Sequence, residues 1–343
     1  MSFIFFKKHR KVFECSKKNK NVNSVYVKSP SRLIVSGEHS SEYNGVSVAC
    51  AISFFVEVNI KKTNFPVIII RNNGQKTVTE IKDFSIEKKN NNILLEIIRR
   101  FFDTTKTPIF GIEMNIKNEV PVGYGFASSS SLICGIIFGL NELFNTKCKA
   151  DVLMQMALNI ENIFHGESEN IDIHTIVRGG VLYQDCDKIT KIPHPLDEIW
   201  LINTGRPSFS SKNVLYAVQD KYSSSKIWDE FREVSEDIAE IMNTKEPLNI
   251  KIAHNESLLE KIGIVKPSIV GLLKDLKKYD IYGKVCGYGT IADKDIQGGN
   301  GIVAIFQVLD KTDVMLLKKV CKKYHFAFQK VHISNAGVLV KSK

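Results

Sequence analysis

The alternation of apolar and polar residues predicts that the chain starts with a sheet. Residues 25–36 and 46–59 are rich in β-branched and apolar side chains, as strands are, and the turn-forming segment 37–45 joins them. Over 92–102 the apolar residues recur every three or four positions, which predicts an amphipathic helix with one buried face. A strand over 108–116 is expected next, so a sheet with a helix packed on it opens the fold.

Two longer helices are predicted in the next part of the chain. The first, over 129–145, follows a loop that contains glycine. The second, over 150–165, turns one apolar face inward, and Gly166 is placed to end it. The residues of that inward face are Leu153, Met156, Ala157, Ile160 and Phe164. The order of elements is therefore strand, glycine loop, helix.

The last part of the chain mixes strands and helices. The expected elements are strands at 200–203, 284–287, 302–306 and 326–340 and helices near 225–243, 247–262 and 268–278. Because they do not alternate as βαβ units do, the sequence favours an α+β fold over a doubly wound sheet. The expected division is a basic N-terminal extension over 1–24, a first domain over 25–195 and a second domain over 196–343.

Composition narrows the class of protein. The chain has 343 residues, of which 43% are hydrophobic and 24% charged, which suits a globular enzyme with a sizeable core. No apolar run reaches the roughly 18 residues that cross a bilayer, and residues 1–6 are too short for a signal sequence. The seven cysteines form no CxxC pair, which argues against a disulfide framework or a zinc site. A cytoplasmic protein with no membrane partner is predicted.

The net charge of +10 raises the question of a polyanionic partner. Lysine and arginine are spread thinly over most of the chain, which is typical of a merely basic protein. The exception is residues 7–20, where seven basic residues face only Glu14. We interpret this stretch as a solvated extension that could attract polyanions weakly. No specific nucleic-acid partner is expected.

The first stretch with candidate chemistry is 121–131, which reads PVGYGFASSSS and enters an apolar helix. Glycines let a ligand approach the backbone, and a helix N-terminus offers unpaired N–H groups, so the pair suits phosphate. The stretch lacks the GK[ST] ending of a Walker loop and does not match GxGxxG. A plain loop with a helix cap would look the same.

Carboxylates supply the second candidate group. A serine at the start of the helix could ligate Mg²⁺ together with Glu161 on the following helix, although a lone helical glutamate is often just solvated. Asp172 lies between two isoleucines and is a candidate for a positioned base, or else for a capping or turn residue. His165 and His174 have no standard metal spacing and are expected to be structural.

The third stretch, 29–39, is a predicted strand that bears Arg32 and ends in Gly37-Glu38-His39. A cation, a carboxylate and an imidazole near one strand end suit the recognition of a polar, anionic substrate. Taken alone, this stretch is weak evidence.

Together and in this order, these stretches resemble the GHMP kinases. Residues 29–51 look like the first motif of that family, 123–131 like its ATP loop, and 284–289 like the start of its third motif. Within the family the chain is most similar to the mevalonate kinases, on the evidence of 37–39, 203–205 and the stretch from Glu161 to Asp172. The separation of these two carboxylates, eleven positions in the chain, matches that between the family's metal ligand and its catalytic aspartate.

The resemblance implies a two-domain fold with mixed sheets, an active site in the cleft between the domains, and MgATP as the phosphoryl donor. It implies that Ser129 and Glu161 hold Mg²⁺, that Asp172 faces the acceptor hydroxyl, and that Arg32 stands at the place of the catalytic lysine. The residues that it puts beside the triphosphate are Gly123, Tyr124, Gly125, Ala127, Ser128, Ser129 and Ser130. The residues that it puts beside the substrate are Glu38, His39 and Thr204.

The implied reaction is the phosphorylation of mevalonate to 5-phosphomevalonate, for isoprenoid precursors, and a homodimer is compatible with it. Three departures leave alternatives open: Arg32 replaces lysine as in galactokinase-like members, 168–170 read Ser-Glu-Asn where Pro-Ser-Gly is usual, and 290–299 replace a plain glycine run. Arg32 and the Tyr-Asn-Gly at 43–45 favour a sugar kinase. The altered third motif would also suit a catalytically weak protein that only binds a small molecule.

Overall fold

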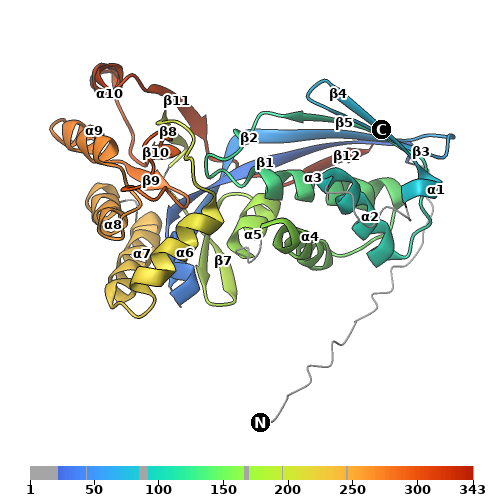
Figure 1. Cartoon of the computed structure of the whole chain (residues 1–343), viewed down its shortest axis with the longest axis horizontal. Coiled ribbons are helices and arrows are strands. Elements are labelled where there is room, and N and C mark those ends of the chain that lie inside the picture. The colour runs from blue at the N-terminus through green and yellow to red at the C-terminus, as the bar shows by residue number, and fades with distance from the viewer. Residues whose placement is uncertain are drawn as a thin grey trace, which may run out of the picture.

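The computed structural model describes residues 22–43, 45–84, 92–165, 170–194, 196–244 and 246–342. Two sheets lie toward opposite ends of the molecule (Figure 1). Helices α2 to α5 lie along one face of the larger sheet, and helices α8 to α10 surround the smaller one (Figure 1). The mixture of sheets and helices confirms the α+β prediction.

The larger sheet has eight strands and is mixed. Six follow the order β12-β1-β2-β5-β3-β4, while β6 pairs with β2 and β7 with β6. Among the described strands of this sheet, β3 and β5 pair in parallel and the other neighbours are antiparallel. Its strands are β1 (Ser24–Ser36), β2 (Val46–Lys62), β3 (Val67–Asn72), β4 (Gln75–Glu80), β5 (Ile112–Asn118), β6 (Val181–Asp185), β7 (Lys188–Ile192) and β12 (Leu339–Ser342).

Strand β2 has two different partners on the edge away from β1. It pairs with β6 over 46–50 and with β5 over 56–62, so these two partners separate beside residues 51–55. On its other edge, Ala51 is paired with Arg32 of β1. The sheet therefore divides beside the strand position that carries the predicted catalytic cation.

The helices over the larger sheet are close-packed on it. If Gly139 of α3 carried a Cβ, that atom would lie 2.8 Å from Ile60 Cδ1 and 2.9 Å from Val27 Cγ2, so glycine lets the helix approach the strands. These helices are α1 (Ile81–Phe84), α2 (Ile93–Thr105), α3 (Ser128–Phe144), α4 (Ala150–His165) and α5 (Asn170–Arg178), and a 3₁₀ turn, η1 (Ser40–Tyr43), follows β1.

The smaller sheet is antiparallel, with the order β11-β8-β10-β9. Its strands are β8 (Glu198–Asn203), β9 (Lys284–Cys286), β10 (Ile302–Ile305) and β11 (Ala327–His332). The helices of this part are α6 (Ser211–Tyr222), α7 (Ile227–Thr244), α8 (Asn249–Lys261), α9 (Pro267–Lys277) and α10 (Lys311–Lys323). Buried apolar residues of both parts join in one core, because α7 packs against β2 and η1.

Several sequence expectations are wrong in detail. The segment 326–340 is not one strand: β11 belongs to the smaller sheet, and β12 returns to pair with β1. Helices α6 and α10 were not expected, because Gly, Pro and Ser before α6 and the many lysines of α10 obscure the apolar period. Asp172, whose local structure the sequence left open, lies in the first turn of helix α5.

Other predictions fall partly outside the described residues. Residues 1–21 of the basic extension, Asn44, Gly166 and 168–169 lie there, as does the side chain of His165. The described part of the chain holds six cysteines, all with free thiols. Within it, no helix is both long enough and apolar enough to cross a membrane.

Candidate active site

Arg32 of strand β1 and Asp172 of helix α5 form an ion pair between the larger sheet and the helices that cover it. Arg32 Nε donates to Asp172 Oδ1 and Arg32 Nη2 donates to Oδ2, so the guanidinium fork grips both carboxylate oxygens. The two side chains are 8% and 15% exposed. Because α5 packs against β1, residues 140 positions apart in the chain meet here. The predicted catalytic pair is thus brought together.

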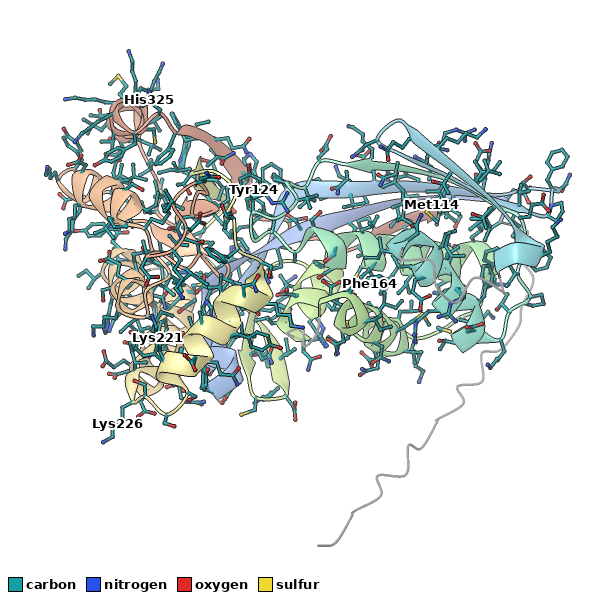
Figure 2. All side chains as sticks on the ribbon, viewed as in Figure 1. Met114, Tyr124, Phe164, Lys221, Lys226 and His325 are labelled. Atoms are coloured by element: carbon teal, nitrogen blue, oxygen red, sulfur yellow. The ribbon has the colours of Figure 1, made fainter. Side chains whose placement is uncertain are left out.

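Arg32 also fixes the predicted phosphate loop. Its Nη1 donates to the carbonyl oxygen of Gly125 at 3.0 Å, and its backbone N–H donates to Phe126 O at 3.3 Å. The φ values of Gly123 and Gly125, +84° and +85°, lie in the left-handed region, which glycine adopts without strain. Tyr124 of this loop lies where the two halves of the molecule meet (Figure 2). The loop leads directly into the N-terminus of α3.

The serines at the start of α3 have different surroundings. Ser128 Oγ accepts from Asn118 Nδ2 at 3.2 Å, and Ser131 Oγ donates to Pro30 O at 2.9 Å. Ser130 is buried. Ser129 Oγ instead donates to Glu161 Oε1 on α4 at 2.6 Å. This hydroxyl and carboxylate lie side by side, as the sequence predicted for a metal pair.

A magnesium ion fits this donor set. Mg²⁺ prefers oxygen ligands and usually takes one or two from the protein, with phosphate oxygens and waters completing the set. A larger all-protein cage is absent from the described chain, which has no cluster of three or more His, Cys, Asp or Glu side chains suited to a metal. Ser129 and Glu161 therefore suit a metal that arrives with a nucleotide.

Glu38 and His39 lie in the interior, against the segment of the third motif. Glu38 pairs with Lys284 of β9, and these side chains are 2% and 0% exposed. His39 Nε2 donates to Tyr288 O at 3.2 Å, and its ring lies edge-on to the Tyr288 ring. Burial lowers the pKa of His39 to about 4, so its imidazole is neutral at pH 7. Both predicted substrate residues therefore contact the second half of the chain.

A second carboxylate lies next to this ion pair. Glu256 of α8 is buried, and its Oε2 accepts from Val285 N at 2.7 Å. Burial raises the pKa of Glu256 to about 8, so the group holds a proton at pH 7. Burial opposes the charge of Lys284, yet Glu38 beside it keeps the pKa of the lysine raised. One ion pair and one neutral acid share this region, which we call the buried cluster (Glu38, Lys284 and Glu256).

Thr204 is held by the segment that follows the third motif. Its Oγ1 donates to Gly301 O at 2.9 Å and accepts from Asn300 N at 3.2 Å. The phosphate loop touches the third motif as well: a Cβ on Gly125 would lie 3.0 Å from Cys286 O and 3.4 Å from Gly287 Cα. Thr204 and Gly125, two predicted site residues from different halves of the chain, therefore both contact the segment 286–301.

Sequence reasoning missed three charged residues near these contacts. Arg206 lies against Gly123 of the phosphate loop, Glu256 contacts the backbone of β9, and Lys284 of β9 pairs with Glu38. A lysine in the apolar strand Lys-Val-Cys was a signal of a buried ion pair, because a buried lysine needs a partner. Arg206 and Glu256 carried no such signal.

Comparison with known proteins shows similarity to small-molecule kinases. The family described as "GHMP kinases N terminal domain" matches residues 92–180, which span α2 to the end of α5. Mevalonate kinase of Archaeoglobus fulgidus is 25% identical over 282 residues, which cover 81% of this chain and 91% of that protein.

Two solved structures show how far the fold is shared. Methanococcus jannaschii mevalonate kinase superposes with a TM-score of 0.77 at 20% identity, covering 90% of this chain and 98% of that one. Lactococcus lactis galactokinase, complexed with galactose, gives a TM-score of 0.75 at 16% identity, covering 92% and 95%. Residues 92–180 thus match the GHMP kinases, a family of small-molecule kinases, and the sequence similarity to mevalonate kinases extends along most of their length.

Proposed function

We propose that this protein transfers the γ-phosphoryl group of MgATP to the primary hydroxyl of mevalonate. The observation that carries the proposal is the position of Arg32, whose guanidinium joins the carboxylate of Asp172 to the carbonyl of Gly125. One cation thereby spans the expected acceptor end and the expected phosphate end of the site. The cytoplasm is the proposed location.

Asp172 orients the acceptor hydroxyl in this proposal. Each carboxylate oxygen has two lone pairs, and Arg32 takes one on each side, so lone pairs remain to accept the O–H of an alcohol. Gripped at both oxygens, the carboxylate cannot rotate away, and the hydroxyl is aligned before transfer. Asp172 accepts the proton late, as the bond from oxygen to phosphorus forms.

The phosphoryl donor, MgATP, is held in this proposal by Arg32, the phosphate loop and the pair formed by Ser129 and Glu161. Phosphoryl transfer has a loose transition state, so alignment and charge neutralisation supply most of the catalysis. Bound Mg²⁺ would add positive charge beside the phosphates. The backbone N–H groups at the start of α3 and the cation of Arg32 act on the same charge from the protein side.

The proposed position of the active site in a cleft rests on a division of the chain into two domains. We propose that residues 25–195 form the nucleotide-binding domain and 196–343 the second domain, with β12 crossing back to the larger sheet. Contacts between Gly125 and the 286–287 segment support a site at their junction. We assign no role in catalysis to the basic extension.

A sugar is the second candidate acceptor. Arginine at position 32 is the residue of galactokinase-like members, and the fold is shared with a galactokinase. The pairing of Glu38 with Lys284 removes one carboxylate from direct substrate recognition, which leaves the choice of acceptor to neighbouring groups.

A substrate-panel assay tests the proposal. Purified protein is given MgATP and mevalonate, galactose or homoserine, and ADP release is followed with product identification by mass spectrometry. We expect the turnover of mevalonate to exceed that of galactose or homoserine by at least about 10²-fold, because a site whose polar groups hydrogen-bond one substrate discriminates strongly against others. Turnover of galactose alone would replace mevalonate by a sugar, and absence of turnover with all three would leave a binding protein.

A further inference from the structure

An arginine that belongs to no predicted motif lies against the phosphate loop. A Cβ on Gly123 would fall 2.6 Å from Arg206 Nε, 3.0 Å from Cζ and 3.2 Å from Nη2. The guanidinium thus occupies the space that a side chain at position 123 would need. Among the described residues it has no hydrogen-bond or salt-bridge partner, and it is exposed.

The backbone that carries Arg206 is held in place on both sides. Arg206 lies between β8 and α6, in the turn 204–210. Its carbonyl oxygen accepts from Gly299 N at 2.8 Å, and the carbonyl of Gly205 accepts from Gly301 N at 2.8 Å. These bonds come from the segment 290–301, which lies between β9 and β10 in the chain.

Asp295 ties this segment to the same turn. Its Oδ2 accepts from Ser208 N at 3.0 Å and from Thr290 Oγ1 at 2.5 Å, and its Oδ1 accepts from Gly298 N at 2.7 Å. Burial works against the charge of Asp295, but these hydrogen bonds lower its pKa to about 2, so it is ionised at pH 7. An ionised acceptor makes each of these bonds stronger than a neutral one would.

Two adjacent glycines of the segment, Gly298 and Gly299, allow its close approach. A Cβ on Gly299 would lie 2.2 Å from Thr204 O, and one on Gly298 would lie 2.4 Å from Ser208 N. No side chain fits at either position without separating the segment from the turn. The segment 290–301 therefore braces residues 204–208.

We propose that Arg206 is a further nucleotide-binding residue, which contacts the phosphate chain of ATP over Gly123, and that Asp295 is the positioning residue that braces it. The proposal rests on the proposed kinase function. A guanidinium matches phosphate oxygens in charge and geometry, and one without a protein partner loses no existing bond when it binds phosphate. Gly123 is then required both for its left-handed φ and for the space that the guanidinium takes.

Nucleotide binding without acceptor tests the inference directly. The dissociation constant of Mg²⁺ with the non-hydrolysable analogue AMP-PNP is measured by isothermal titration calorimetry for wild type, Arg206→Ala, Arg206→Lys and the control Lys212→Ala, which removes an exposed cation from the adjacent helix. We expect Arg206→Ala to weaken binding about tenfold or more, since hydrogen bonds to charged groups are worth that much. Arg206→Lys should lie between, and Lys212→Ala should match wild type.

Asp295 needs a readout that a merely structural role would not move. Asp295→Asn should weaken AMP-PNP binding several-fold, and the double variant with Arg206→Ala should be no weaker than Arg206→Ala alone, because Asp295 acts through Arg206. Additive losses would overturn the bracing role. In turnover, Arg206→Ala should raise the KM for ATP and leave the KM for mevalonate unchanged.

The outcomes separate this inference from the proposed function. Wild type that binds AMP-PNP, together with Arg206→Ala that binds it equally well, would overturn the role of Arg206 and leave the kinase proposal standing. Wild type that binds no nucleotide would overturn both.

Discussion

The candidate active site and the buried cluster both contain ion pairs, but the side chains of the two pairs differ in their exposure to water. Arg32 and Asp172 keep 8% and 15% of their side-chain surface exposed, whereas Lys284 and Glu38 keep 0% and 2%. An ion pair that contacts a substrate needs one face that the substrate can reach. In a fully buried pair, each charge must be neutralised by its partner. Loss of one partner should therefore affect rate in the first region and stability in the second.

The largest effect is expected from breaking the buried cluster. Lys284→Met leaves Glu38 as an uncompensated buried charge, which should lower the free energy of unfolding by about 3–5 kcal/mol. Urea denaturation followed by circular dichroism measures this loss. Lys278→Met, which breaks the exposed pair with Asp275, is the control and should cost much less. A loss no greater than that of the control would contradict the comparison.

Asp172→Asn tests the open region. The amide keeps the shape of the side chain but cannot accept the proton of the acceptor, so kcat should fall by about 10² or more. The melting temperature should stay near that of wild type, because solvent can reach the pair. Steady-state kinetics and a thermal melt measure the two halves of this prediction. A variant of near wild-type rate would remove Asp172 from the mechanism.

The buried cluster should also make stability depend on pH. Burial raises the pKa of Glu256 from 4.5 to about 8, so between these values the folded protein keeps a proton that the unfolded chain has lost. Raising the pH through this window therefore lowers the free energy of unfolding, by on the order of 1 kcal/mol per pH unit. Glu256→Gln should flatten the dependence.

A matched carboxylate provides the control for this pH prediction. Glu233→Gln removes an exposed glutamate from α7 and should keep the wild-type slope. Denaturant melts at several pH values between 5 and 8 on all three proteins decide the matter. An unchanged slope in Glu256→Gln would mean that Glu256 is ionised in the folded state.

The smallest effects are expected from two serine substitutions, one in the candidate active site and one in the interior. Ser129→Ala removes one proposed metal ligand, so the Mg²⁺ concentration for half-maximal activity should rise several-fold without loss of stability. Ser36→Ala removes the acceptor of Asn255 Nδ2, at 2.9 Å in the interior, and should cost about 1–2 kcal/mol without a change in Mg²⁺ dependence. The same response in both variants would erase the distinction.

Local patterns predicted most elements, and the family resemblance supplied the residues of the candidate site. The long strands, α2, α3 and α4 have strong apolar periods, and the motif order placed Arg32 with Asp172 and Ser129 with Glu161. Those predictions needed only periodicity and resemblance. The roles of the predicted site residues remain proposals.

What the sequence could not predict depends on distant pairing. Helix α10 presents lysines on most of its surface, and only burial of Leu317, Val320 and Cys321 marks its inner face. Nothing local in 290–301 shows that its glycines pack on 204–208, because that contact joins segments about 90 residues apart. Arg206 therefore looked like an ordinary surface cation.

The short strand β12 has a consequence for how the molecule can be divided. Its residues Leu339 to Lys341 pair with Lys28 to Tyr26 of β1, so the end of the chain covers the outer edge of the sheet that the beginning forms. A fragment that stops near residue 195 would leave that edge bare, and a bare edge invites pairing with other molecules. Gene segments cut at the apparent midpoint should aggregate, while a circularly permuted version that keeps β12 beside β1 should remain dispersed.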